Sequence, residues 1–167
     1  MNIFFLSLNA QEAAQMACDK HVVKMILEST QMLYAAQHLL PSKLDSSPLV
    51  PYKLAHKNHP CTIWTRASLS NYMWLCNLAF SYCEEYRFRY GVSKVHACEV
   101  HLKWLFANPP ELNDIGFTTC PQAMPDQYKS ESVVKAYRRY YLGEKLSFVK
   151  YTRREVPSWI SKRLKKK

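Results

Sequence analysis

Near its N-terminus the sequence reads Asp19-Lys20-His21-Val22-Val23-Lys24, a polar run set into an apolar helical pattern. Apolar residues recur around it with a period near 3.6, which is typical of a helix that packs against a core. They include Ala13, Ala14, Met16, Ala17, Met25, Ile26, Leu27, Met32 and Leu33. At about 100° per residue, one polar arc of that helix carries Lys20, His21, Lys24, Glu28 and Gln31. The first long helix therefore presents several groups capable of acid–base chemistry on one face.

Asp19 projects near the middle of the apolar arc, where a carboxylate must cap the helix, be paired, or act in a buried site. Two interpretations of the stretch stay open. In the first, Asp19 is an N-cap, and Lys24 and Glu28 form an ordinary i,i+4 pair on a solvated face. In the second, the stretch belongs to a site that handles an anion, with Lys20 and Lys24 holding it.

Composition favours one mainly α domain. The chain has 167 residues, of which 48% are hydrophobic and only three are Gly, and it contains no Gly-rich phosphate loop. We expect a single compact helical domain over residues 1–160, with a short extended segment or edge strand at 2–7, and a basic tail over 161–167. Helices are predicted over 10–40 (one helix or a pair), 62–90 with Gly91 as its C-cap, 94–106 and 130–141, with loops at 41–51 and 107–129.

The six cysteines are scattered and form no CxxC pair, which disfavours a zinc ribbon. The sequence has no signal peptide and no apolar stretch of about 18 residues. We therefore expect reduced thiols in a cytoplasmic protein, with no membrane partner, no metal and no cofactor.

Charge is distributed very unevenly. Residues 1–128 contain 10 Lys/Arg and 10 Asp/Glu, whereas residues 129–167 contain 13 Lys/Arg and 3 Asp/Glu. The whole net charge of +10 therefore lies in the last segment, and aromatic residues are interleaved with it. Basic side chains hold phosphates and aromatic rings stack on bases, so this pattern favours a nucleic-acid partner. The candidate contacts are Arg138, Arg139, Lys145, Arg153 and Arg154.

A second polar cluster, His56-Lys57-Asn58-His59-Pro60, precedes the predicted helix at 62–90. Asn58 and His59 either cap that helix or contribute to a phosphate site at its N-terminus. His21 and His59 are candidate general acids or bases. Lys20 and Lys24 are candidate phosphate ligands, or one of them is a Schiff-base lysine.

Five segments spread along the chain share a distinctive composition: Met1-Asn2-Ile3-Phe4, Cys18-Asp19-Lys20-His21-Val22-Val23-Lys24-Met25, His56-Lys57-Asn58-His59-Pro60 with Trp64, Ala123-Met124-Pro125-Asp126 with Tyr128-Lys129, and Ala136-Tyr137-Arg138 with Tyr140-Tyr141. Together they resemble a family of largely uncharacterised bacteriophage and large-virus proteins. For a viral protein, the cytoplasm is that of the infected host.

The order of the segments is also distantly similar to the phage-type pyrimidine-dimer DNA glycosylases. That resemblance implies a compact helical domain that binds DNA, exposes a lesion, and attacks the sugar with the N-terminal amine, aided by a glutamate in the first-helix motif. The chain departs from it at two positions. The bulk of Asn2 hinders removal of Met1, and His21 takes the place of the motif glutamate, with Glu28 one turn or more later.

The sequence thus predicts a DNA-acting viral protein of glycosylase-like type, with a base or a sugar as its target. Its candidate catalytic residues are Asp19, His21, Lys24 and His59. The candidate nucleic-acid contacts are Lys20, Asn58 and the five C-terminal basic residues. Two alternatives stay open, a non-catalytic nucleic-acid-binding protein and an enzyme that acts on free nucleotides.

Overall fold

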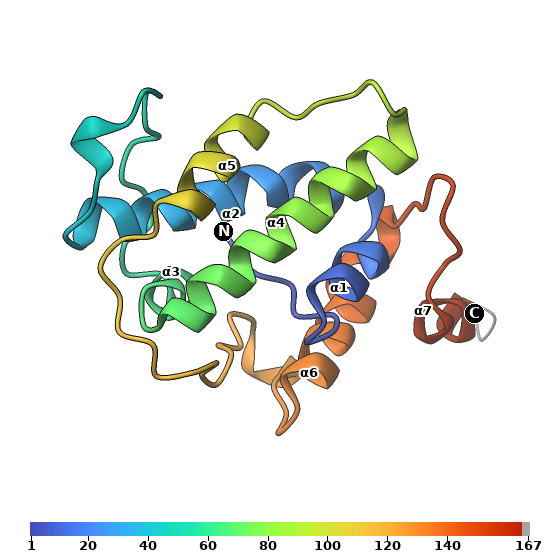
Figure 1. The fold of residues 1–167 in the computed structure, drawn as a ribbon. Helices are drawn as coiled ribbons and strands as arrows, with labels where there is room; N and C mark the ends of the chain where they lie inside the picture. The colour runs from blue at the N-terminus through green and yellow to red at the C-terminus, as the bar shows by residue number, and fades with distance from the viewer. Residues whose placement is uncertain (165–167) are drawn as a thin grey trace.

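A computed structural model of the protein describes residues 1–164. Within that range there are seven α-helices and no β-strand, which confirms the mainly α prediction. The helices (Figure 1) are α1 (Ala10–Met16), α2 (Asp19–Leu39), α3 (Pro60–Thr65), α4 (Leu69–Tyr90), α5 (Glu99–Ala107), α6 (Val133–Tyr140) and α7 (Ser158–Leu164).

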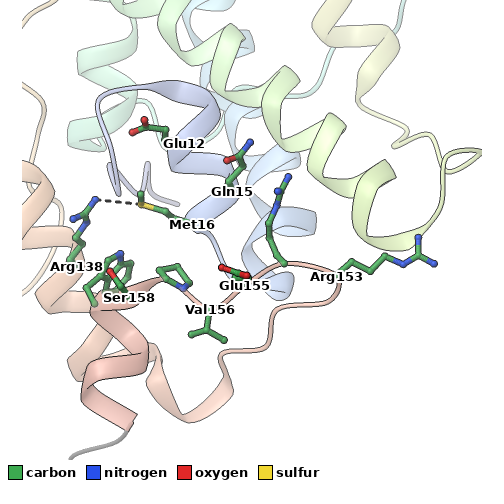
Figure 2. Close-up of a pocket in the computed structure, with 11 residues that line it drawn as sticks. Glu12, Gln15, Met16, Arg138, Arg153, Glu155, Val156 and Ser158 are labelled. Carbon is green, nitrogen blue, oxygen red and sulfur yellow. Dashed lines mark hydrogen bonds between the residues drawn. The ribbon is translucent and has the colours of Figure 1, made fainter.

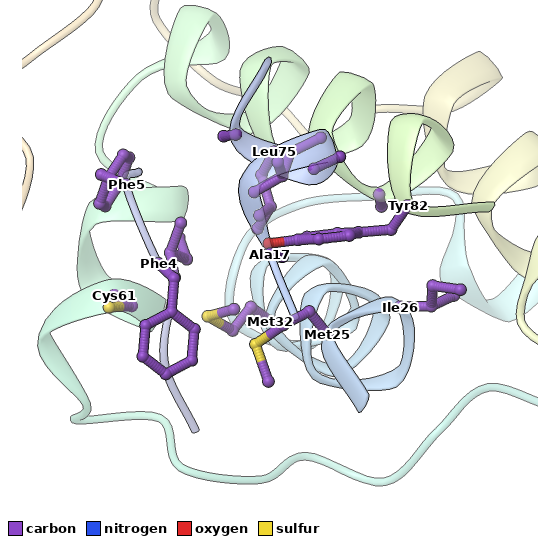
Figure 3. Packing of buried hydrophobic residues seen from close by; sticks show 14 of the residues in the cluster. Phe4, Phe5, Ala17, Met25, Ile26, Met32, Cys61, Leu75 and Tyr82 are labelled. Atoms are coloured by element: carbon purple, nitrogen blue, oxygen red, sulfur yellow. The ribbon is translucent and has the colours of Figure 1, made fainter. Parts of the chain in front are cut away.

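The core forms where α4 packs against both α1 and α2. The extended segment at the N-terminus forms no strand, but it is buried, and Phe5 and Leu6 are completely inaccessible. Figure 3 shows side chains from this segment, α2, α3 and α4 meeting in one cluster. The segment is held by side-chain packing in place of a β-ladder, and it brings the first two residues against Glu28 of α2.

Local capping explains most of the helix ends. Asn9 accepts a hydrogen bond from the Glu12 amide at the start of α1, and Ser132 accepts one from Lys135 at the start of α6. Pro60 is the first residue of α3, where its missing N–H costs no intrahelical bond. Gly91 ends α4 with a φ of 125°, as the sequence predicted.

The helix predicted over 62–90 is wrong in one respect, because the chain breaks at residues 66–68 into α3 and α4. Ser68 is extended (φ −156°, ψ 148°), and Asp114 Oδ1 accepts hydrogen bonds from the amide and hydroxyl of Ser70. A carboxylate from a distant loop therefore caps α4, which no local pattern shows.

Two other predicted boundaries shift. Residues 94–98 are irregular with a turn at 97–98, so α5 starts later than expected, and α6 continues into a π-helical turn over Tyr141–Lys145. The predicted tail at 161–167 is partly helical, since α7 extends to Leu164. Residues 165–167 lie outside the described residues.

All six cysteines are buried free thiols. Among residues 1–164, no three His, Cys, Asp or Glu side chains are grouped so that they could hold a metal ion. None of the helices in that range is both long and apolar enough to cross a membrane.

Candidate active site

A small cavity of about 160 Å³ opens at the N-terminus. It lies between the extended N-terminal segment, α2 and the end of α6. Its lining combines one carboxylate, two lysines, a histidine and the start of the chain: Met1, Asn2, Phe4, His21, Lys24, Met25, Glu28, Tyr140 and Lys145. Three of the residues that the sequence put on one helix arc, His21, Lys24 and Glu28, therefore meet in one pocket.

The Glu28 carboxylate is the centre of this pocket. Only 7% of the residue is exposed. Its Oε2 accepts a hydrogen bond from the Asn2 amide (2.8 Å) and lies 3.7 Å from the amino group of Met1. Its Oε1 pairs with Lys24 Nζ at 3.3 Å. Contrary to the expectation that Glu28 comes too late in the helix, it is the carboxylate that reaches the N-terminal amine.

The Asn2 side chain joins three further segments to the pocket. Its Nδ2 donates to the carbonyl of Ala123 (2.9 Å), and its Oδ1 accepts from the Tyr137 hydroxyl (2.8 Å). Cys61, the second residue of α3, donates its thiol proton to the same Oδ1 (3.6 Å). Four of the segments that the sequence singled out, 18–25 with its helix, 56–60 with α3, 123–129 and 136–141, therefore converge on the first two residues.

His21 lines the cavity but is only 6% exposed. Its ring stacks on Phe4, with centroids 4.3 Å apart and an interplanar angle of 15°, and its Nδ1 is hydrogen-bonded to the Tyr141 hydroxyl. Burial, followed by the positive charges of Lys145, Lys24 and Lys20, lowers the pKa of His21 to about 4. The imidazole is neutral at pH 7, so it serves the pocket as a neutral hydrogen-bonding group.

This pKa predicts acid sensitivity of the fold. The unfolded chain takes up a proton at His21 near pH 6.5, whereas the native state resists it down to about pH 4. The contribution of neutral His21 to the free energy of unfolding is therefore fully present above pH 6.5. It declines as the pH falls toward 4, where the free energy of unfolding is lower by about 3 kcal/mol. Urea unfolding of wild type and His21→Gln at pH 7.5 and pH 4 measures this. Between pH 7.5 and pH 4, the free energy of unfolding of the variant should fall by about 3 kcal/mol less than that of wild type. Equal falls in both proteins would contradict the assignment.

Two lysines, Lys24 and Lys145, line the pocket, and a third, Lys20, lies close enough to His21 to affect its charge state. Lys145 lies over the Tyr140 ring (4.8 Å from the centroid), and Lys20 lies over Phe148 (5.0 Å). Lys24 is 63% exposed even though it pairs with Glu28. These ammonium groups, each next to an aromatic face or the carboxylate, can hold phosphates at the rim of the cavity.

Asp19 lies outside this pocket, in a buried ion-pair network. It is the first residue of α2 and provides no side-chain cap there. Its Oδ1 accepts from Arg89 (3.1 Å), and its two oxygens accept from the amide and hydroxyl of Thr152. Arg89 also donates to Glu85 (3.0 Å), which in turn pairs with Arg154. The carboxylate is fully engaged in fastening the C-terminal segment to α2, a structural role that the sequence did not separate from a catalytic one.

His59 and Asn58 do not line the pocket. The Nδ1 of His59 accepts a hydrogen bond from the Cys61 amide, so His59 caps α3 as the structural interpretation predicted. Burial, and then the positive charge of the nearby N-terminal amine, lower the pKa of His59. Asn58 is exposed in the turn before it.

The five C-terminal basic candidates differ in whether their charged groups are already bonded within the protein or are exposed to a partner. Arg138 donates twice to the carbonyl of Leu6, and Arg154 to both oxygens of Glu85. Arg139 donates to the carbonyls of residues 127 and 129 but stays exposed, as does Arg153. Lys145 alone of the five lines the pocket. The net charge of the segment therefore overstates the cations that are available to a partner.

A larger cavity of about 590 Å³ lies between α1 and the segment that leads into α7 (Figure 2). Its lining mixes Glu12 and Glu155 with three arginines, two of which, Arg138 and Arg154, are engaged as described above. Figure 2 shows Arg138 directed at Met16. Size alone would favour this cavity as the site. However, none of its charged groups is both enclosed by the fold and free of internal contacts, and the N-terminal amine does not line it.

The candidate site residues drawn from the sequence did not include Met1, Asn2, Tyr137 or Glu28, although the resemblance to the pyrimidine-dimer glycosylases implied a nucleophilic N-terminal amine. The signal for Glu28 was present, because it shares the helix arc of Lys24 and His21. The local pattern did not show that Glu28 would lie beside the amine, since that depends on how the extended segment packs. No family model, no curated protein and no solved structure matches the chain, so the geometry of this pocket is what bears on function.

Proposed function

We propose that the protein acts on a sugar in DNA, using the amino group of Met1 as nucleophile and the Glu28 carboxylate as acid–base partner. The observation that carries this is the placement of a buried carboxylate 3.7 Å from the N-terminal amine in a small cavity with a cationic rim. The same pair of groups is what the resemblance to the pyrimidine-dimer glycosylases implies.

The chemistry follows from these two groups. The amine attacks the C1′ aldehyde of an open-chain abasic sugar, forms a C–N bond and expels water as the imine forms. Glu28 then takes the proton from C2′, the electron pair forms a C2′–C3′ double bond, and the 3′-phosphate leaves with the electrons of the C3′–O bond. Hydrolysis of the imine returns the amine. On an intact nucleotide the same attack would first displace the base.

The dimensions of the site favour a polymer over a free nucleotide. Pockets that enclose a whole small molecule usually measure about 300–1,000 Å³, whereas this one measures about 160 Å³. It accommodates a fragment such as one sugar, while Lys145 in the lining and Lys20 near His21 meet the neighbouring phosphates. Exposing that fragment from a duplex costs a few kcal/mol, least where the base is damaged or missing.

The test is a trapping assay. Purified protein is mixed with intact, UV-irradiated and abasic duplexes, with and without borohydride, which reduces an imine to a stable covalent adduct. We expect an adduct and strand cleavage on abasic DNA. Peptide mapping of the adduct should place the DNA on Met1, and an adduct on Lys24 or Lys145 would contradict the assignment of the nucleophile.

Two other outcomes separate the alternatives. Salt-sensitive binding of duplex without adduct or cleavage would overturn the enzymatic proposal in favour of a nucleic-acid-binding protein, which the exposed basic residues would also support. If the protein neither binds duplex DNA nor forms an adduct, an enzyme that acts on free nucleotides is favoured.

Salt dependence identifies which cations contact DNA. Each neutralised phosphate contributes about −0.9 to the slope of log K against log salt concentration. Replacing Lys145 or Lys20 by Ala should therefore make the slope shallower by about one. Lys103→Ala on α5, a lysine that pairs with Glu99 away from the pocket, is the matched control and should leave the slope unchanged. Equal slopes for all variants would place the DNA elsewhere.

A further inference from the structure

Asn2 connects the first residues of the chain to several distant segments of the fold through hydrogen bonds. Terminal residues are poorly ordered unless something ties them down, and an amine that acts as a nucleophile must be held within about 1 Å of its reacting position. Three partners from three separate segments bond the Asn2 side chain, and its own amide donates to Glu28.

We propose that Asn2 is a positioning residue, whose side-chain amide fixes the backbone so that the amino group of Met1 faces Glu28. The inference rests on the proposed function, in which that amine is the nucleophile. It adds a residue and a mechanism that the resemblance does not imply.

The partners of Asn2 are suited to an amide and to no other side chain of that size. Burial raises the pKa of Cys61 to about 11 and also raises that of Tyr137, so both remain protonated donors at neutral pH. Asn2 Oδ1 accepts from both, and Nδ2 donates to a carbonyl. An aspartate would lose that donor and add a second carboxylate beside Glu28. A leucine would leave the Cys61 thiol and the Ala123 carbonyl without this partner, and Tyr137 with only its bonds to Pro121 and Ala123.

Met1 itself is anchored in the same way. Its side chain is only 2% exposed, and its sulfur accepts a hydrogen bond from Thr62 Oγ1 (3.5 Å). The side chain of Met1 is held by α3, the backbone amide of Asn2 by Glu28, and the Asn2 side chain by its three partners. The amine of Met1 therefore has little freedom to leave the carboxylate.

Two variants test the proposal. Asn2→Leu removes every polar contact of the side chain and keeps enough bulk to retain Met1. Tyr137→Phe removes one of the donors to Asn2 and leaves the first two residues unaltered. The control is Tyr34→Phe, which removes another buried hydroxyl that bonds to His101 on α5. Melting curves verify that each variant folds, and intact masses verify that each begins at Met1.

The two readouts separate this inference from the proposed function. The first is the rate of adduct formation at saturating abasic duplex, together with the Kd. The second needs no DNA. Glyceraldehyde and cyanoborohydride alkylate amines, because the imine that forms with loss of water is reduced to a secondary amine by hydride. Mass spectrometry of the peptides that contain Met1 and Lys24 then measures how selectively Met1 reacts relative to Lys24.

We expect both variants to lower the adduct rate about tenfold or more with an unchanged Kd, and to reduce the selectivity for Met1 by about the same factor, whereas Tyr34→Phe changes neither. Unchanged values in both variants would overturn the positioning role, as would an intact wild-type mass that lacks Met1. If wild type forms no DNA adduct but both variants lose the selectivity for Met1, the proposed function fails and the positioning role stands.

Discussion

Arg89→Met should destabilise the protein by about 3–5 kcal/mol, the loss typical of removing one partner from a buried ion pair. The Arg89 side chain is fully buried. Its guanidinium bonds the carboxylates of Asp19 and Glu85, at 3.1 Å and 3.0 Å, and the carbonyls of Gln15 and Ala17. Methionine fills a similar volume but leaves two carboxylates and two carbonyls buried without this donor. Since whole domains are stable by only about 5–15 kcal/mol, the loss is a large share of the total.

Urea unfolding and thermal melting measure this effect, and the melting temperature should fall by roughly 10 °C or more. Arg153→Met is the matched control, because that arginine is exposed on the same C-terminal segment, and its change should stay within about 0.5 kcal/mol. Asp19→Asn should also destabilise, with loss of activity that follows loss of folded protein. A stable Asp19→Asn variant with no activity would instead return Asp19 to the list of catalytic residues.

The parts of the fold that depend on local pattern were predictable. The apolar period around residues 13–33 predicted α1 and α2 as a helix or helix pair, and Gly91 marked the end of α4. The break between α3 and α4 was not predictable, because Asp114, more than 40 residues away, caps α4. Local sequence contains no information about which distant carboxylate will reach a helix end.

The site was predictable to the same extent. Helical spacing placed His21, Lys24 and Glu28 on one arc, and all three line the pocket. The same spacing put Asp19 on the apolar side but could not reveal its partner Arg89, 70 residues later. The charge count likewise made Arg154 a candidate nucleic-acid contact. The composition of the segment could not show that Arg154 pairs with Glu85 on α4.

Glu28→Gln should reduce the rate of adduct formation and strand cleavage at saturating abasic DNA by about 10²–10⁴-fold, the range over which a positioned acid or base contributes. Glutamine keeps the size of the side chain and an oxygen that accepts from the Asn2 amide, the 2.8 Å bond that holds the backbone. It removes the negative charge and the basic oxygen that face the amine and the proton at C2′. DNA affinity should therefore change little. The melting temperature should fall, because the Met1 amine and Lys24 lose their carboxylate partner, but the variant should remain folded in the assay.

The matched control is Glu99→Gln on α5. Glu99 is a carboxylate of similar burial that pairs with Arg87 and Lys103 and lies outside the pocket, so its variant should cleave at the wild-type rate. Single-turnover cleavage and gel-shift titration of the three proteins separate the possibilities. A Glu28→Gln variant with a wild-type rate would remove Glu28 from the chemistry. A variant that lost affinity and kept its rate at saturation would make Glu28 a binding residue, because only an interaction made in the transition state lowers the rate of bound substrate.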